Sequence, residues 1–221
     1  MRIAILGNGK MGKRIAELAI ENGDKVVAIS DSNRPAISLN LKNSDVAIDF
    51  STPDTAFENI SHSIINGIPT ISGTTGWLNR IDDINELCIE KKGAFLYSSN
   101  FSLGMNIFYE LNKKLAELMR NHDYKNHIYE VHHKEKKDTP SGTAIKIADD
   151  IKDILNSKPD IISKRIDDVT GTHQIIYSSE VDNIEIKHTA KNRDGFAIGA
   201  LLAAKWLIGK RGIFSINDII T

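Results

Sequence analysis

The first hundred residues alternate short β-branched and apolar runs with stretches of helical periodicity. In the first of these stretches Met11, Ile15 and Leu18 recur on one face of a helix. Further helices are predicted at 53–65 and 78–91, whereas only about fifteen residues separate the second strand from the third, too few for a full crossover helix. The predicted strands cover residues 2–6, 25–30, 46–50, 68–72 and 94–98. Strands that alternate with helices build βαβ units, so the sequence predicts an α/β domain with a parallel sheet.

A glycine-rich turn, GNGKMG, follows the first predicted strand and opens the first predicted helix. In such a G-x-G-x-x-G turn, backbone N–H groups at the positive end of the helix can approach a pyrophosphate. Asp31 ends the second strand, where its carboxylate can accept hydrogen bonds from a ribose. The alternative is a plain glycine turn with a solvated aspartate, but strand, helix and acid stand in register for a Rossmann-like dinucleotide-binding domain. The motif residues are Gly7, Asn8, Gly9, Lys10, Met11 and Gly12.

A second pair of glycines, GTTG at 73–76, ends the fourth predicted strand. Open α/β sheets bind ligands at this carboxyl edge, so Gly73, Thr74 and Thr75 are candidates for cofactor contacts. A flexible turn without a ligand explains the same residues equally well.

The pattern changes after Asn100, which marks a predicted domain boundary. Residues 102–195 contain helical periodicities at 103–120 and 142–155, the alternating segment HIYEVHH, and two strands joined by a tight turn near Asp182. They predict a smaller α+β domain with an antiparallel or mixed sheet. A small polar sheet offers no apolar surface against which the predicted helix at 196–208 could pack. Residues 196–221 are therefore assigned to the first domain, with residues 1–101.

The segment EVHHKEKKDTPSGTA, residues 130–144, concentrates groups that can bind anions and transfer protons. Ser141 precedes the helix as a plausible N-cap, which leaves the amides of Gly142 and Thr143 at the positive helix end. These groups suit a carboxylate, and Lys136 or a histidine is left to donate a proton. The alternative is that the segment binds no ligand and is only a capped helix after an exposed charged loop. We expect no metal, because adjacent histidines on a strand diverge and no cysteine or nearby carboxylate completes a ligand set.

Charge and cysteine content exclude several classes of protein. The chain has 28 basic and 29 acidic side chains, so no global field favours nucleic acid. The single cysteine, Cys88, excludes an internal disulfide and fits a reducing compartment. The apolar run at the start is too short for a signal-peptide core, and the longest later run, at 196–208, is shorter than a membrane span and contains Lys205. A cytoplasmic protein without nucleic-acid or membrane partners is expected.

The segment at 130–144 resembles the signature E-x-H-H-x-x-K-x-D-x-P-S-G-T-A of the dihydrodipicolinate reductase family. VAIDFSTP, ISGTTGW, SSNFSLGMN and HTAKNRDGFAIGA are similar to further family segments, in the family's order. Two departures concern the adenosine end of the cofactor: the glycine loop is one residue shorter than the common form, and residues 31–45 are trimmed. The signature is matched by Glu130, His132, His133, Lys136, Asp138, Pro140, Ser141, Gly142, Thr143 and Ala144.

The resemblance implies an NAD(P)H-dependent oxidoreductase of the diaminopimelate route to lysine. Hydride would pass to C4 of a cyclic imine with two carboxylates, with loss of the 4-hydroxyl as water, to give tetrahydrodipicolinate. The family's catalytic pair corresponds to His132 and Lys136, with Lys136 as the proton donor. The substrate's carboxylate would be held by His133, Ser141, Gly142 and Thr143. The nicotinamide would be lined by Gly73, Thr75, Asn100, Phe101 and Ser102, and the resemblance adds Thr74 and Ser99 to the cofactor-binding residues.

The resemblance also implies a homotetramer, built by pairing the sheets around residues 172–190, whose second face has few residues to cover it. Asp31 favours NADH, while Arg34 softens the repulsion of a 2'-phosphate, so both cofactors are expected to work. No role is assigned to Arg193 or Phe196. Two alternatives are another two-domain nicotinamide enzyme, such as aspartate or homoserine dehydrogenase, and a catalytically inactive nucleotide sensor. Aspartate and homoserine dehydrogenases lack the combination of H-H-x-x-K with P-S-G-T, and a nucleotide sensor would have no need of these residues.

Overall fold

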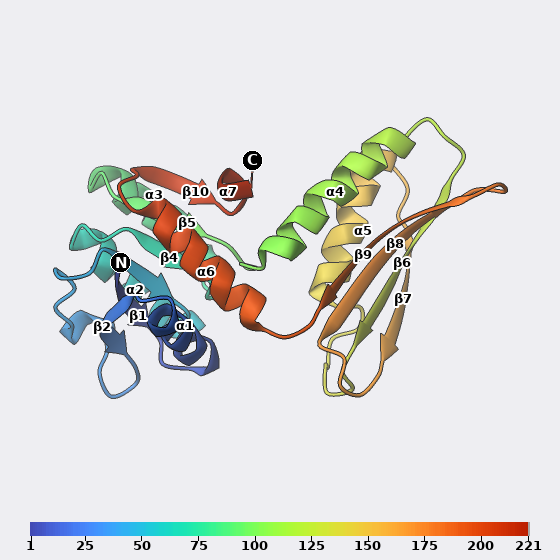
Figure 1. Ribbon diagram of the computed structural model, residues 1–221. Helices are drawn as coiled ribbons and strands as arrows, with labels where there is room; N and C mark the ends of the chain where they lie inside the picture. The colour runs from blue at the N-terminus through green and yellow to red at the C-terminus, as the bar shows by residue number, and fades with distance from the viewer. Residues whose placement is uncertain (221) are drawn as a thin grey trace. The chain divides into compact units, whose positions relative to one another are not determined.

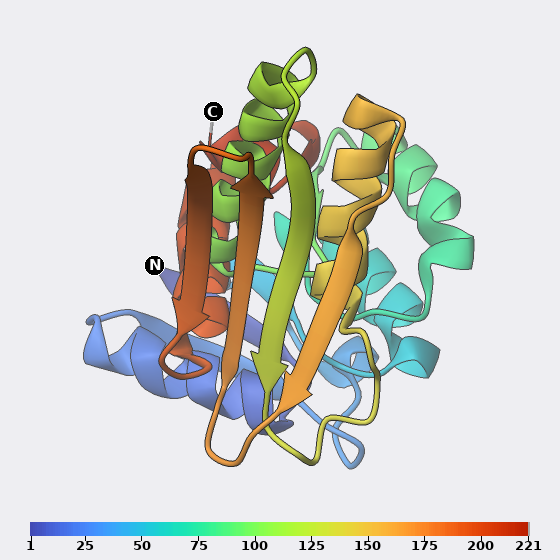
Figure 2. The ribbon, with the colours of Figure 1, turned by 90° about the vertical axis from the view of Figure 1, so that its right-hand side faces the viewer.

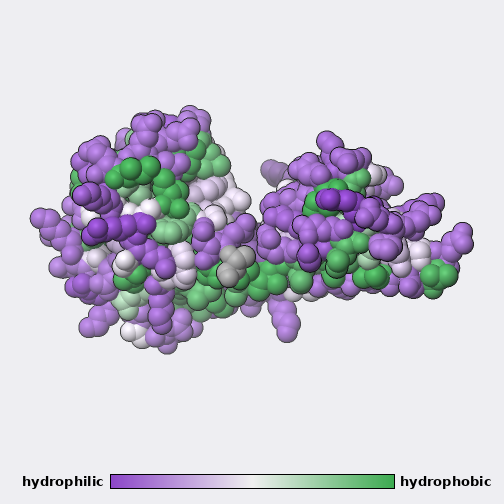
Figure 3. Space-filling view, turned by 90° about the horizontal axis from the view of Figure 1, so that it is seen from above, coloured by the Kyte–Doolittle hydropathy of each residue, from purple (hydrophilic) through white to green (hydrophobic). Residues whose placement is uncertain are grey.

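The structure is a computed structural model that describes residues 1–220, and it divides into two compact units. The first unit comprises Met1–Leu103 and the chain from Asp194 onward, and the second comprises Gly104–Arg193. Mostly hydrophilic side chains cover the face seen in Figure 3, with smaller apolar patches on each unit. Within the described residues, no helix is both long and apolar enough to cross a membrane.

The first unit contains a six-stranded sheet in which every neighbouring pair of strands is parallel. The strand order is β10-β5-β4-β3-β1-β2, so the chain moves outward from β1 in one direction to β2 and in the other to β3. The strands are β1 (Arg2–Leu6), β2 (Lys25–Ser30), β3 (Val46–Asp49), β4 (Thr70–Ser72), β5 (Ala94–Tyr97) and β10 (Gly212–Ser215). All five strands predicted in the first hundred residues are therefore present, and β10 is one that the sequence did not predict.

Helices cover both faces of this sheet (Figure 1). One core joins α1 and α6 to alternate side chains of the central strands, for example Ile3 and Ile48. A second core places α2 and α3 against Phe95 on the other face. The short crossover after β2 is a single turn of 3-10 helix, η1 (Ala36–Ser38), as its length predicts. The helices are α1 (Lys10–Glu21), α2 (Pro53–Ile65), η2 (Leu78–Arg80), α3 (Ile81–Glu90), α6 (Asp194–Leu207) and α7 (Asn217–Ile220).

Helix α6 is apolar on nearly every side because it lies in the core of the first unit. Its residues Ala197, Ala200 and Leu207 are fully buried beside the first strands of the chain. Gly199 permits this packing, since a Cβ there would lie 1.7 Å from the carbonyl oxygen of Phe101. In the structure this helix belongs to the same compact unit as Met1–Leu103.

The second unit is a mixed four-stranded sheet in the order β7-β6-β8-β9, with two helices on one face (Figure 2). Ile128, Ile175 and Tyr177 face those helices and form the core with them. The elements are α4 (Leu103–Met119), β6 (Lys125–His132), α5 (Gly142–Leu155), β7 (Asp160–Arg165), β8 (Gly171–Ser178) and β9 (Asn183–Ala190).

Two features of this sheet decide the position of the site. Strand β7 runs parallel to β6, joined to it through α5, and its presence was not predicted. Strand β8 runs antiparallel to β6, with Glu130 opposite His173. The predicted hairpin is present, with a turn between Ser178 and Asn183.

Candidate active site

The glycine loop after β1 has the conformation that a phosphate cradle requires. Gly7 has φ of 107°, and a Cβ there would lie 2.3 Å from the carbonyl oxygen of Phe50. At Gly12 a Cβ would lie 1.9 Å from the Gly7 oxygen, so both positions exclude a side chain. Helix α1 begins at Lys10 with Gly9 as N-cap and no side-chain cap. Its first amides therefore have no capping side chain and are available to an anion.

A cavity of about 450 Å³ in the first unit opens beside this loop. Asp31 lies on its wall, with Oδ1 accepting the backbone N–H groups of Asn33 and Arg34, which fixes the carboxylate. Sequence reasoning missed the wall contributed by the end of β3 and by α2, although the rule that ligands lie at the carboxyl edge applies there too. The lining residues are Gly7, Asn8, Gly9, Ser30, Asp31, Ser32, Pro35, Ala36, Ile37, Phe50, Ser51, Thr52, Thr55, Glu58 and Asn59.

The loops after β4 and β5 reach the same edge of the sheet. Gly73 packs on the Phe50 ring so closely that a Cβ would lie 2.3 Å from it, and Thr74 accepts a hydrogen bond from the N–H of Ser51. The Phe101 ring packs against Phe50 with centroids 5.7 Å apart. Thr75, like Lys10 and Ser99, is exposed, and Met11 and Asn100 are half-buried. The cofactor candidates from three loops are thus brought together around Phe50.

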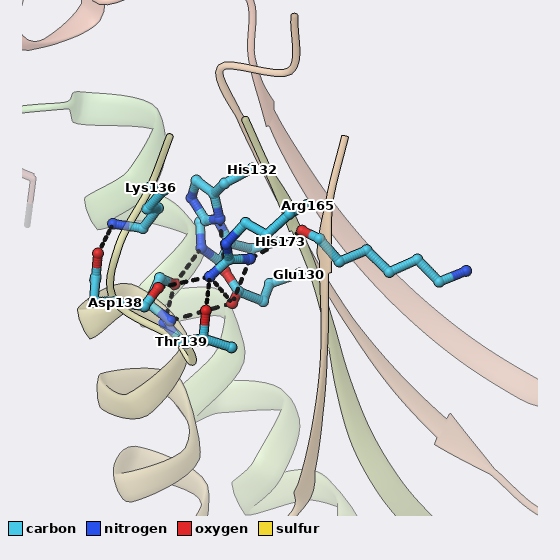
Figure 4. Close-up of polar contacts among 10 residues, drawn as sticks. Glu130, His132, Lys136, Asp138, Thr139, Arg165 and His173 are labelled. Carbon is cyan, nitrogen blue, oxygen red and sulfur yellow. Dashed lines mark hydrogen bonds and ion pairs between the residues drawn. The ribbon is translucent and has the colours of Figure 1, made fainter. Parts of the chain in front are cut away.

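In the second unit, Glu130 and His132 point from β6 into the interior, as their alternation predicts (Figure 4). His132 Nδ1 lies 2.6 Å from Glu130 Oε2. Nδ1 faces the carboxylate, so we assign the ring proton to it, which leaves Nε2 as the acceptor. Gly171 makes room for that edge of the ring, since a Cβ there would lie 3.1 Å from Nε2.

Arg165, the last residue of β7, holds the other oxygen of Glu130 (Figure 4). Its two terminal nitrogens lie 3.2 and 3.1 Å from Glu130 Oε1. One of them also donates to the carbonyl of Asp138 at 2.7 Å and to the hydroxyl of Thr139 at 2.9 Å. One guanidinium therefore connects the buried carboxylate to the loop that carries the lysines. Sequence reasoning missed Arg165, because only the parallel pairing of β7 with β6 brings it here.

The pKa values in this cluster are shifted by burial and by mutual charge. Burial raises the pKa of Glu130, but donors from Ser163, Ser141 and Arg165 outweigh it and lower the pKa to about 2. Burial lowers the pKa of His132; the Glu130 carboxylate opposes this effect and the Lys136 ammonium adds to it. The cluster thus holds an ionised Glu130 beside an imidazole that is easily kept neutral.

His173, from β8, is a further member that the sequence did not reveal. Its Nε2 lies 3.2 Å from the Ser141 hydroxyl, and its ring lies 5.0 Å from that of His132. Burial, and then the neighbouring His132, lower the pKa of His173 to about 4. It is therefore neutral at physiological pH. The signal that could have found it is the register of β6 on β8, which no local pattern encodes.

The predicted N-cap at Ser141 is confirmed. The Ser141 hydroxyl accepts the backbone N–H of Ala144 at 3.2 Å, and the backbone N–H of Ser141 donates to Glu130 Oε1. Gly142 at the start of α5 is exposed and Thr143 is half-buried. Lys136 Nζ lies 2.8 Å from the Asp138 carboxylate, so the lysine side chain is held near the helix start (Figure 4).

His133 lies just beyond the end of β6, which ends at His132. The strand alternation that would turn two adjacent histidines to opposite faces therefore does not apply to His133. It lines a second cavity, of about 230 Å³, together with Asp168, Val169, Thr170 and Arg193. Arg193, to which the sequence assigned no role, thereby brings a cation to the same cavity as His133.

The expectation that no carboxylate lies near the histidines is wrong. One atom each of Glu130, His132 and His173 lies within 4.8 Å of the others, a spacing that could hold a metal ion. The Arg165 guanidinium, however, already contacts Glu130, and a cation beside it would be repelled. The donor set fits a proton-carrying network better than a divalent cation.

Both halves of the chain match models of one protein family. Residues 1–101 match "Dihydrodipicolinate reductase, N-terminus", and residues 104–220 match "Dihydrodipicolinate reductase, C-terminus". A curated 4-hydroxy-tetrahydrodipicolinate reductase from Christiangramia forsetii is 45% identical and covers 100% of this chain and 98% of its own. Another, from Thermosipho africanus, is 36% identical with the same coverage.

Two solved structures share the fold. Dipicolinate-bound dihydrodipicolinate reductase from Paenisporosarcina sp. TG-14 has a TM-score of 0.80 at 24% identity and covers 100% of this chain and 99% of its own. A probable dehydrogenase from Thermotoga maritima has a TM-score of 0.63 at 12% identity and covers 99% of this chain and 92% of its own.

Proposed function

Because the chain belongs to the dihydrodipicolinate reductase family, we propose that it is the NAD(P)H-dependent reductase that forms tetrahydrodipicolinate in lysine and diaminopimelate biosynthesis. The substrate is the cyclic 4-hydroxy-tetrahydrodipicolinate, an imine with two carboxylates. When bound, NADH or NADPH supplies a hydride to C4, the 4-hydroxyl leaves as water, and the ring takes up one proton. The observation that carries this proposal is the cluster of Glu130, His132 and Lys136 beside the capped start of α5, in a chain whose two halves match one family.

The first unit supplies the groups that fit the cofactor. Gly7 and Gly12 let backbone segments approach so closely that a Cβ would collide with them, and helix α1 begins without a side-chain cap, which leaves its first amides to an anion. Asp31 stands on the wall of the adjoining cavity, where it suits a ribose. Gly73, Thr74 and Phe101 would stand nearer the nicotinamide, since they lie at the same carboxyl edge.

The second unit supplies the groups that fit the substrate. Lys136 is the proposed proton donor, and His132 assists it as a neutral imidazole held by Glu130. The start of α5, with Ser141, Gly142 and Thr143, suits one carboxylate. We add Arg193, which lines a cavity with His133 and offers a guanidinium to the substrate's negative charge. Lys136 is exposed enough to reach a bound ligand, with 24% of its side chain accessible.

We further propose a homotetramer that pairs the second unit's sheets. Tyr129, Ile162 and Ile176 alternate with the core residues of their strands and so point away from α4 and α5. Figure 2 shows that sheet face turned to the viewer, in front of both helices. Ile162 is 47% exposed there, an apolar surface that a second copy would cover. Sedimentation velocity at micromolar concentration should give a species near four times 24.5 kDa, and a monomer would contradict the assembly.

A cytoplasmic location is part of the same proposal. Cys88 is a free, buried thiol, which suits a reducing compartment, and the required reduced cofactor is an intracellular metabolite.

A coupled assay tests the function. The substrate is generated in situ from pyruvate and aspartate semialdehyde by a condensing enzyme, and oxidation of NADH is followed by its absorbance. Oxidation should depend on both precursors and on the condensing enzyme. If NADH and NADPH bind but neither is oxidised in the complete mixture, the chain is a sensor or acts on another substrate.

A further inference from the structure

Asp49, the last residue of β3, is a buried carboxylate to which the proposed function assigns no task. Its side chain has no exposed surface, and in the described part of the chain it forms no ion pair with a basic side chain. Burying a carboxylate without a cation is costly, so hydrogen bonds must hold it. Such groups concentrate at functional sites.

Four side chains from different segments supply those hydrogen bonds. Oδ1 lies 2.6 Å from the Ser51 hydroxyl, in the loop after β3, and 3.4 Å from the Asn59 amide, on α2. Oδ2 lies 2.8 Å from the Ser72 hydroxyl, on β4, and 2.7 Å from the Thr74 hydroxyl, in the following loop. Asp49 therefore joins the loops that follow two neighbouring strands.

The donors around two of these hydroxyls favour bonds in which the hydroxyl donates to Asp49. The Thr74 hydroxyl accepts the Ser51 N–H at 2.8 Å, and the Ser72 hydroxyl accepts the Thr74 N–H at 3.3 Å. Since an N–H can only donate, each hydroxyl has its own proton left for Asp49. Oδ2 can therefore receive both hydroxyl protons, an arrangement that suits an ionised carboxylate. The Ser51 distance of 2.6 Å lies in the range of charge-assisted bonds to a carboxylate, and the Ser72 and Thr74 distances of 2.8 and 2.7 Å are ordinary for O–H···O bonds.

The same contacts lead directly to the cofactor cavity. Ser51 and Asn59, which both face Oδ1, line the cavity that contains the glycine loop and Asp31. The backbone carbonyl of Asp49 also accepts the N–H of Gly73 at 2.9 Å. The carboxylate therefore fixes one wall of that cavity and the GTTG turn at once.

We propose that Asp49 is a positioning residue of the cofactor site, that it is held as a carboxylate, and that its buried charge favours NAD+ over NADH. The inference rests on the proposed function only in taking nicotinamide dinucleotides as the ligands. The nicotinamide ring becomes cationic when it gives up its hydride, and a nearby buried negative charge stabilises that form. Burial raises the pKa of Asp49 above its ordinary value, and its four donors offset only part of this effect. We nevertheless infer the ionised form, because each of the four neighbouring side chains can donate to the carboxyl and none of them can only accept.

Asp49→Asn separates charge from position. The Asn carbonyl can replace Oδ2 as the acceptor of two hydroxyls, while its amide faces Ser51, whose hydroxyl can accept. Thr74→Val does the reverse, because it keeps the charge and removes the link between the two loops, and Thr74→Ser restores the hydroxyl. Asp45→Asn is the matched control: it removes a carboxylate at the other end of β3, where Asp45 pairs with Arg2 at the surface.

The readout is the dissociation constant of NADH, from its fluorescence, and that of NAD+, from displacement of NADH. Asp49→Asn should raise the ratio of the NAD+ constant to the NADH constant at least fivefold, and Asp45→Asn should leave the ratio unchanged. Thr74→Val should weaken both ligands at least fivefold by the same factor, and Thr74→Ser should bind them like the wild type. A folded Asp49→Asn protein with the wild-type ratio, or a Thr74→Val protein with wild-type affinities, overturns the proposal. Wild-type protein that binds neither NADH nor NADPH would instead contradict the proposed function. If Asp49→Asn fails to fold, the comparison of Thr74→Val with Thr74→Ser still tests the proposal.

Discussion

His132 Nδ1 lies 2.6 Å from Oε2 of Glu130, whose side chain is fully buried. The carboxylate fixes the orientation of the imidazole and keeps its proton on Nδ1, so Nε2 stays free to accept. In Glu130→Gln the amide can face His132 and donate to Nδ1, which forces the proton onto Nε2. We expect kcat to fall by about 10². Because Glu130 raises the pKa of His132, the corresponding limb of the pH–rate profile should move to lower pH.

The control for this prediction is Glu135→Gln, at an exposed position of the neighbouring loop. It should retain the kcat and the pH profile of the wild type. A Glu130→Gln enzyme with an unshifted pH profile would show that the carboxylate only supports the fold.

Arg165 should resist replacement by lysine. An ammonium cannot reach Glu130, the Asp138 carbonyl and the Thr139 hydroxyl together, as the planar guanidinium does. We expect Arg165→Lys to destabilise the fold by about 1–3 kcal/mol and to lower kcat/KM for the dicarboxylate by roughly tenfold. Denaturant unfolding and steady-state kinetics measure the two effects. Lys158→Gln, at an exposed position just before the same strand, should change neither, and equal effects in both variants would refute the role of Arg165.

His173 should make the protein sensitive to acid. Its folded-state pKa is about 4 and its ordinary value is 6.5, so the unfolded chain binds the proton more readily. The stability that depends on the neutral ring is complete above pH 6.5 and is lost as the pH falls toward 4. The linkage amounts to roughly 3 kcal/mol. His173→Gln should flatten the fall of Tm between pH 6.5 and 4, whereas His122→Gln, at an exposed position, should leave the slope as it is.

The sequence predicted the local parts of the molecule and missed the contacts between strands. The βαβ pattern, the glycine loop and the N-cap at Ser141 depend on residues close together in the chain, and all three are present. Arg165 and His173 reach Glu130 only because β7 and β8 flank β6, a pairing that periodicity does not encode. The meeting of Ser51 and Thr74 at Asp49 likewise requires the loops after β3 and β4 to converge.

Cofactor preference follows from the charge on the cavity wall. Asp31 and Glu58 both line it, and none of its lining residues is a lysine or an arginine. A 2'-phosphate would meet two carboxylates there, although Arg34 is close in sequence and can approach it. We expect both cofactors to work, with kcat/KM for NADH equal to or above that for NADPH. A value for NADPH at least tenfold higher would contradict the role of Asp31, and Asp31→Ala should move the ratio toward NADPH.

The central claim is that Lys136 donates the proton in an NAD(P)H-dependent reduction, and its most direct test is the kcat of Lys136→Met in the coupled assay. Loss of a general acid costs about 10²- to 10⁴-fold in rate, so kcat should fall at least about 10²-fold. Tm should stay unchanged, because the Lys136–Asp138 pair lies near the surface, and NADH affinity should stay unchanged, because the other unit holds the cofactor cavity. Lys134→Met and Lys137→Met, at exposed positions of the same loop, should behave as the wild type. Retention of more than about a third of the wild-type kcat in Lys136→Met, or greater damage in Lys134→Met, would contradict the assignment.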